Sequence, residues 1–120
     1  MVYLADHPAS ALLELLVRID PDLIPDSYTL LRVAIPDTIP ITIVKPDALP
    51  EDWRDRQAVT RQLGDRWLDE GATPIMQVPS AIIPMALNMI VNPAHPTVNE
   101  LRIVDVIPAA FDSRLFRLPG

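Results

Sequence analysis

"VPSAIIPMALNMIVNP", residues 78–93, interrupts an apolar run with three prolines, a serine and two asparagines. Each proline lacks an amide donor and biases the preceding residue away from the helical conformation. The stretch therefore cannot form one continuous helix or strand, and the chain must turn within it. Burying an unpaired polar group is costly. Ser80, Asn88 and Asn92 therefore either hold a turn together or face a ligand.

Helices and strands of mixed type surround this stretch. A helix is predicted over 6–20, where Asp6 or His7 can cap the first turn and Pro8 suits it. A second helix is predicted over 55–71, with Gly71 at its end. Strands are predicted over 27–36, 41–44, 74–80 and 100–108, and 111–116 is expected to pack by its aromatic and leucine side chains. Because these elements do not alternate as regular βαβ units, the predicted class is α+β.

The periodicity of apolar residues predicts which faces are buried. The expected stripe of the first helix is Ala9, Leu12, Leu13, Leu16 and Ile19. The expected face of the first long strand is Thr29, Leu31, Val33 and Ile35. The expected face of the second helix is Val59, Leu63 and Trp67.

Size and composition bound the class of protein. A chain of 120 residues fits one domain, 1–120, with a single core. The chain has no cysteine, which excludes disulfides and thiolate chemistry and is compatible with a cytoplasmic location. No secretory signal and no apolar run long enough for a membrane span are found. The net charge is −6 without a basic stripe, so direct binding to nucleic acid is not expected.

Taken one by one, the polar residues have ordinary explanations. Glu14 lies almost opposite the apolar stripe, which favours a solvated carboxylate. Tyr3 lies in an apolar segment, which favours a buried tyrosine with a satisfied hydroxyl. Ser80 can cap a following helix, and His95 can brace a proline-rich turn. His7 and His95 lack the spacing of zinc ligands, so no metal site is predicted.

The order of several sequence blocks is more specific than any single residue. The blocks are "VYLADHPASALLELLVRID", "IPDSYTLLRVAIPD", "LPEDW", "QLGDRWLDEG", "VPSAIIPMALNMIVNPAHP" and "FDSRLF". Together they resemble the RES-domain family of bacterial toxins, in the family's order and over nearly the whole chain. The "YLA…ALLE" and "VPSAI-P…N-x-x-x-NP-x-HP" blocks are the most specific.

The resemblance implies a single domain related to the ADP-ribosyltransferase fold. It implies a toxin that degrades NAD⁺ by cleaving the nicotinamide–ribose bond through phosphorolysis, hydrolysis or ADP-ribosyl transfer. NAD⁺ is then the substrate, phosphate is a candidate co-substrate, and no further cofactor is expected. The implied partner is an Xre-type helix-turn-helix antitoxin, and self-association to a homo-oligomer is a further option.

The resemblance also implies which residues carry the chemistry. By motif, the catalytic tyrosine, glutamate and serine are Tyr3, Glu14 and Ser80. A carboxylate suits the oxocarbenium-like ribose that forms when nicotinamide leaves. A helix beginning after Pro79 would present Ser80 and its amides to the pocket. Asn88, Asn92 and His95 are expected to support this loop or to bind substrate, with support favoured.

One family feature has no counterpart in these blocks. Family members carry an arginine in a "GRW"-like context before the "VYLA" block, whereas this chain begins with Met1 and Val2. Arg18 and the chain's other arginines do not lie in a matching motif. The expectation is therefore a RES domain without its N-terminal segment. The alternative to an NAD⁺-degrading toxin is a catalytically inactive module that acts only through protein–protein contacts.

Overall fold

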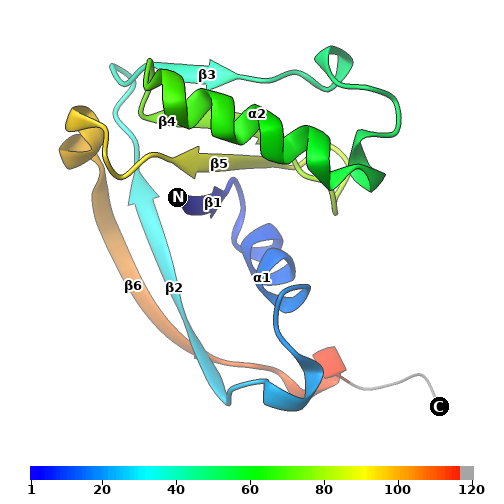
Figure 1. Cartoon of the computed structure of the whole chain (residues 1–120). Coiled ribbons are helices and arrows are strands. Elements are labelled where there is room, and N and C mark those ends of the chain that lie inside the picture. The colour runs from blue at the N-terminus through cyan, green and yellow to red at the C-terminus, as the bar shows by residue number, and fades with distance from the viewer. Residues whose placement is uncertain (117–120) are drawn as a thin grey trace.

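The proline-interrupted stretch forms a turn between two neighbouring strands in the computed structural model, which describes residues 1–116 (Figure 1). Strand β4 (Ile75–Pro79) ends at the first proline, and β5 (Leu87–Val91) returns antiparallel beside it. Between them the Ser80 amide donates to the Ala86 carbonyl at 2.9 Å. The helix expected after Pro79 is wrong: 81–86 is a turn, and the chain continues as a strand that was not predicted.

Strand β5 lies inside a four-stranded sheet ordered β1-β5-β4-β3. Strand β1 (Val2–Ala5) runs antiparallel to β5, and β3 (Ile41–Ile43) runs parallel to β4. The predicted strands at 41–44 and 74–80 are thus confirmed. Because β5 pairs on both edges, its residues 88–91 each face a neighbour in β1 and another in β4.

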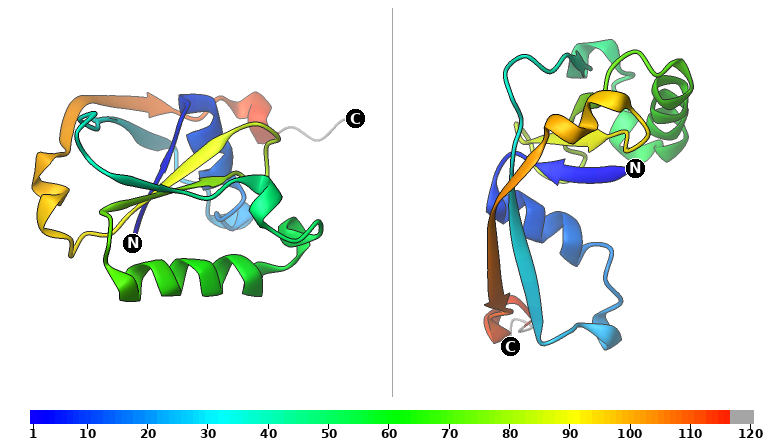
Figure 2. Two further views of the ribbon diagram at one scale, coloured as in Figure 1. Left: turned by 90° about the horizontal axis from the view of Figure 1, so that it is seen from above. Right: turned by 90° about the vertical axis from the view of Figure 1, so that its left-hand side faces the viewer.

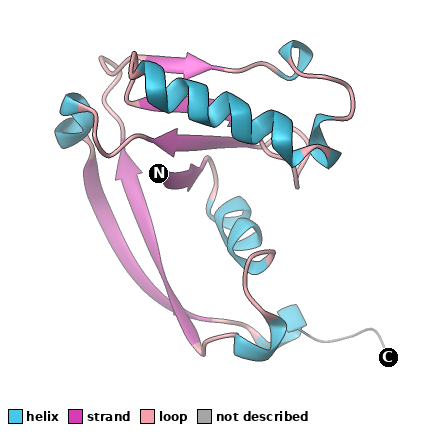
Figure 3. Cartoon of the chain, in the orientation of Figure 1, coloured by secondary structure: helices cyan, strands magenta, loops and turns pink. Residues whose placement is uncertain are grey.

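Alternation along β4 and β5 gives the sheet two buried faces. Met76 and Ile90 face helix α2 (Gln57–Glu70), which lies along one side of the sheet (Figure 2). Ile75 and Val91, their chain neighbours, pack on the other side in a cluster with Ile39. Helix α2 thus covers one face of the sheet, and the helices and strands do not alternate regularly along the chain, which supports the α+β class (Figure 3).

Helix α2 follows its predicted pattern. Gly71 ends it with φ 61°, a left-handed conformation that glycine adopts without steric cost, and its amide donates to the Trp67 carbonyl at 3.1 Å. Val59 and Leu63 are half-buried, and Trp67 is 5% exposed. The expected face is therefore confirmed.

A hydroxyl joins α2 to the sheet. Thr73 Oγ1 accepts a hydrogen bond from Trp67 Nε1 at 3.0 Å and donates to the Ile75 carbonyl at 3.0 Å. It also lies 2.6 Å from Thr42 Oγ1 of β3. The Trp67 indole needs this acceptor because a buried donor without a partner carries the full cost of its desolvation.

Helix α1 (Pro8–Leu16) lies between the four-stranded sheet and a separate pair of strands (Figure 1). His7 caps it by accepting the Ala9 amide at Nδ1, 3.0 Å away. The predicted stripe is only partly covered: Leu12 is half-buried and Leu13 is exposed. The buried residue of this helix is Ser10.

The separate pair of strands is a two-stranded antiparallel ribbon of β2 (Ser27–Ala34) and β6 (Arg102–Ala110). A register shift lies between Arg32 and Val33. The expected buried face is wrong for Thr29 and Leu31, which are exposed, and confirmed for Val33 and Ile35, which lie after the register shift and are half-buried. Tyr28 and Leu30, on the opposite face, are the more buried residues. A two-stranded ribbon has two faces, and the alternation of apolar residues does not show which of them packs against another element.

Short 3₁₀ turns connect these elements. They are Pro21–Leu23, Pro46–Ala48, Trp53–Asp55, Pro96–Glu100 and Ser113–Phe116. The last turn follows Phe111, whose ring lies 4.8 Å from that of Tyr28 and 5.7 Å from that of Phe116. The expected packing of 111–116 is therefore found for its two phenylalanines.

Replacing Thr73 with valine tests the link between α2 and the sheet. Thr73→Val keeps the shape of the side chain and leaves Trp67 Nε1 without its acceptor. We expect a loss of about 1–3 kcal/mol in the free energy of unfolding, measured by urea denaturation with an unchanged m value. Thr60→Val is the control, because that exposed hydroxyl contacts only its own helix at the Gln57 carbonyl. Equal effects of the two substitutions would contradict a role for the Thr73 network.

Candidate functional site

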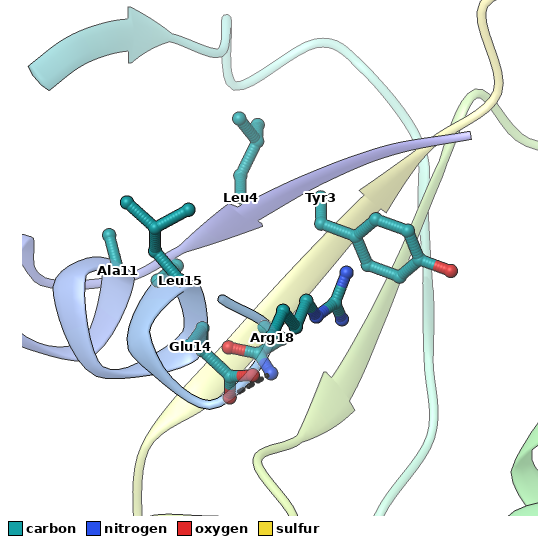
Figure 4. A pocket seen from close by; sticks show the side chains of 8 residues that line it. Tyr3, Leu4, Ala11, Glu14, Leu15 and Arg18 are labelled. Carbon is teal, nitrogen blue, oxygen red and sulfur yellow. Dashed lines mark hydrogen bonds between the residues drawn. The ribbon is translucent and has the colours of Figure 1, made fainter. Parts of the chain in front are cut away.

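A cavity of about 250 Å³ lies where α1 meets β1 and β5 (Figure 4). Helix α1 and the turn after it supply one wall, and the two strands supply the other. The lining residues are Tyr3, Leu4, Ala5, Ala11, Glu14, Leu15, Arg18 and Asn88. The structure thus brings Tyr3, Glu14 and Asn88 together from segments far apart in the sequence.

Glu14 is the central polar group of this cavity. Its Oε1 accepts hydrogen bonds from Ser80 Oγ at 3.0 Å and from Asn88 Nδ2 at 2.9 Å. The side chain is half-buried, so the interpretation as a freely solvated carboxylate is wrong. Within residues 1–116, Glu14 Oε2 accepts no hydrogen bond, which leaves one carboxylate oxygen available to a ligand.

Ser80 holds Glu14 in place and does not line the cavity. Its residue is 1% exposed, and its hydroxyl donates to Glu14 while accepting the amides of Ile82 and Ile83, each at 3.1 Å. A hydroxyl has one proton and two lone pairs, so these three bonds use its full capacity. Ser80 therefore ties the turn together and positions the carboxylate, and it is not presented to the cavity as expected.

Asn88 holds the same carboxylate oxygen at a structural cost. It faces Ala5 of β1 and Val78 of β4 in the middle of the sheet. Its Nδ2 donates to Glu14, but its Oδ1 is buried and has no hydrogen-bond partner among the described residues. Buried polar atoms are normally paired. A leucine or valine would suit this strand position better, so the amide serves the cavity more than the fold.

Tyr3 and Arg18 form the outer part of the cavity. Tyr3 is 50% exposed, so the interpretation as a buried tyrosine is wrong. The Arg18 guanidinium carbon lies 4.7 Å from the centre of the Tyr3 ring, within the range of a cation–π contact. Sequence reasoning set Arg18 aside because it does not lie in a motif matching the family's "GRW"-like arginine. Its place four residues after Glu14 on a helical turn was the available signal.

Asn92 and His95 act at a distance from this cavity. Asn92 Oδ1 accepts the Ala94 amide at 3.1 Å, and the Asn92 amide donates to the Pro74 carbonyl at 2.8 Å. His95 Nδ1 accepts the Thr97 amide at 3.2 Å and caps the following 3₁₀ turn. Neither residue lines the cavity. Their contacts stabilise the turns at 92–97, so their expected support of the loop around Ser80 stays a prediction.

A larger hollow of about 500 Å³ lies elsewhere, beside Leu12, Tyr28 and Leu115. Its charged residues, Asp112 and Arg114, already pair with each other at 2.8 Å. The hydrogen bonds from Arg114 hold the pKa of the Asp112 carboxyl below its usual range. Because both charges are satisfied, this hollow offers a ligand little beyond apolar surface. The smaller cavity, with a free carboxylate oxygen, is the better candidate site.

Two further features were sought in the part of the chain that the structure describes. Residues 1–116 contain no cluster of three or more histidine, aspartate or glutamate side chains placed to hold a metal ion. None of the helices within these residues has the length and apolar character needed to cross a membrane.

Comparisons with known proteins show the family to which this chain belongs. Residues 1–112 match the RES domain. A relative named Toxin Res from Pseudomonas putida is 39% identical over 97% of this chain and 79% of its own length. A relative named Prs ADP-ribosylating toxin from Sphingobium is 30% identical over 98% of this chain and 75% of its own. Another Toxin Res, from Yersinia enterocolitica, is 32% identical over 95% of this chain and 76% of its own. The chain therefore belongs to the RES domain family.

Proposed function

We propose that this chain is a toxin that cleaves the nicotinamide–ribose bond of NAD⁺ in the cavity around Glu14. The observation that carries the proposal is the carboxylate held by one oxygen, with the other free to face a bound ribose. Relatives named as toxins, one of them ADP-ribosylating, support this choice of reaction and substrate. A domain related to the ADP-ribosyltransferase fold is part of the same proposal.

The proposed reaction begins with loss of the nicotinamide ring. The bond between ribose C1′ and the ring nitrogen breaks, and its electron pair leaves with nicotinamide. Positive charge then develops on the ribose ring, where a fixed carboxylate can stabilise it. Glu14 Oε2 is the atom suited to this task, because Ser80 and Asn88 already hold Oε1. An acceptor then attacks C1′ with an electron pair. The acceptor is water, phosphate or a protein side chain, and attack by a protein side chain gives ADP-ribosyl transfer.

Tyr3 contributes a binding surface in this scheme. Its ring is half-exposed on β1, and one of its faces lies under the Arg18 guanidinium. The remaining apolar surface of the ring and the side chains of Leu4 and Leu15 would hold the planar nicotinamide. Ser80 and Asn88 act through Glu14 as positioning residues and have no direct part in bond cleavage.

The proposed partner is an Xre-type helix-turn-helix antitoxin with basic residues near its interface. The net charge of this chain is −6, so a basic partner is favoured electrostatically. A cationic side chain of the partner could enter the cavity, pair with the free oxygen of Glu14 and exclude substrate. Inhibition would then follow from occupation of the cavity, without a change in the fold.

Substituting the carboxylate by an amide tests the proposed chemistry. In Glu14→Gln, the amide oxygen can replace Oε1 as the acceptor for Ser80 and Asn88, whereas no anionic oxygen remains for the ribose. We expect nicotinamide release from NAD⁺ to fall by roughly 100- to 1,000-fold, while the melting temperature stays nearly unchanged. Products are measured by chromatography with and without phosphate, which also identifies the acceptor. The control is Glu70→Gln, an exposed glutamate at the end of α2. Full activity of Glu14→Gln would refute the proposal.

Substituting Asn88 separates positioning from stability. Asn88→Ala removes one donor to Glu14 and also removes a buried oxygen that has no partner within the described residues. We expect turnover to fall by roughly tenfold while the melting temperature stays the same or rises, because the lost amide was poorly satisfied. Asn99→Ala is the matched control on an exposed turn. A marked loss of stability in Asn88→Ala would mean that the amide serves the fold instead.

The proposed antitoxin contact predicts a charge-dependent complex. Co-expression with the product of the neighbouring gene should give a complex that co-elutes in size-exclusion chromatography. Glu14→Gln should weaken this complex by about tenfold, because it removes the negative charge that the partner's cation would meet. Glu70→Gln should leave the affinity unchanged. Separate elution of the two wild-type proteins at micromolar concentration would rule out this partner.

A further inference from the structure

We infer that Arg18 binds a phosphate group of the nucleotide substrate at the outer edge of the Glu14 cavity. The inference rests on the proposed function and adds a specificity-determining residue to it. It assigns the recognition of phosphate to an arginine that does not stand in the family's "GRW"-like context.

The position of Arg18 follows from the end of α1. Its amide donates to the Leu15 carbonyl at 3.1 Å, which continues the helical turn beyond Leu16. Arg18 therefore follows Glu14 by one turn and lines the same cavity (Figure 4). A cation and an anion thus lie along one wall, at different depths relative to solvent: Glu14 is half-buried and Arg18 is exposed.

The charge of Arg18 has no acidic partner among the described residues. The three ion pairs found in residues 1–116 are Arg32–Asp105, Arg56–Asp52 and Arg114–Asp112. Glu14, the nearest acid along the helix, directs Oε1 to Ser80 and Asn88, and makes no ion pair with Arg18. The guanidinium donors are consequently available to a ligand.

The Tyr3 ring favours one position of this guanidinium. Arg18 Cζ lies over the ring at 4.7 Å from its centre, and this cation–π contact stabilises that position relative to free extension into solvent. A guanidinium in this state can offer two parallel N–H donors to phosphate oxygens, and less conformational freedom is lost on binding. Tyr3 therefore acts as a support for Arg18 as well as a wall of the cavity.

The size of the cavity indicates which part of the substrate Arg18 would meet. Its volume of about 250 Å³ is smaller than the range of roughly 300–1,000 Å³ usual for ligand pockets. Only the nicotinamide–ribose end of a dinucleotide would fit beside Glu14, and the adjoining phosphates would emerge at the exposed edge. Arg18 lies at that edge, where its charge favours a phosphate over a neutral group.

The test uses two probes on the same three variants. Inorganic pyrophosphate binding is followed by the NMR amide shifts of Tyr3, Leu15 and Arg18, and NAD⁺ cleavage by steady-state release of nicotinamide. The variants are Arg18→Gln, Arg18→Lys and the control Arg54→Gln. Arg54 is a matched control, because it also lies 4.7 Å over an aromatic ring, that of Trp53, but outside the cavity. Melting temperatures verify that each variant folds.

We expect Arg18→Gln to raise the KM for NAD⁺ by about 10- to 100-fold with kcat changed by less than about threefold. The affinity of this variant for pyrophosphate, measured from the amide shifts, should weaken by at least about tenfold. Arg18→Lys should give intermediate values, because an ammonium keeps the charge and loses the bidentate fork. Arg54→Gln should match the wild type in both measurements.

The two probes separate failure of this inference from failure of the proposed function. NAD⁺ cleavage with an unchanged KM in Arg18→Gln would overturn the inference and leave the function standing. Pyrophosphate shifts that depend on Arg18, without NAD⁺ cleavage by any form, would support the phosphate site and overturn the function. Absence of any pyrophosphate shift in the wild type would overturn the phosphate site.

Discussion

Two hydrogen bonds to one carboxylate oxygen fix the side chain of Glu14 between helix α1 and the four-stranded sheet. They join Glu14 to Ser80 and Asn88, which lie 66 and 74 residues further along the chain. The apolar packing of the helix is only partial, because Leu12 and Leu16 are half-buried while Leu13 and Leu15 are exposed. The position of the Glu14 carboxylate therefore depends on polar contacts, and this carboxylate is also the group proposed to carry the chemistry.

Glu14 and Arg18 carry opposite charges in the same cavity and do not form an ion pair with each other. Ser80 and Asn88 occupy one oxygen of Glu14, and the Tyr3 ring holds the Arg18 cation. The second hollow shows the opposite arrangement, in which Asp112 and Arg114 pair directly and leave no unsatisfied charge. Separated charges in a partly enclosed space interact with a ligand more strongly than a closed ion pair would.

The success of prediction from sequence depended on how local each signal is. His7, Gly71 and the periodicity around Trp67 act within one or two turns, and the structure has both helices there, although α1 ends at Leu16, before the predicted end at residue 20. Tyr3, Glu14 and Ser80 were chosen as a set by family resemblance, and they lie together. The burial of Glu14, the exposure of Leu31 and the contact of Arg18 with Tyr3 depend on which elements meet in space. No local pattern carries that information. The strand Leu87–Val91 was missed for the same reason, since Pro84 and Asn88 argued locally for a turn.

The ribbon of β2 and β6 is closed by residues distant in the chain. Its pairs run from Ser27 with Ala110 to Ala34 with Arg102. Residues 35–101, which include β3, α2, β4 and β5, therefore separate its two strands in the sequence. Closing so long a loop has an entropic cost that a local hairpin does not have, and such pairings slow folding. The strands of the ribbon are thus expected to pair late in folding, after residues 35–101 have become compact. Until then its apolar strands are open to other chains, as they would be on a ribosome before β6 has emerged.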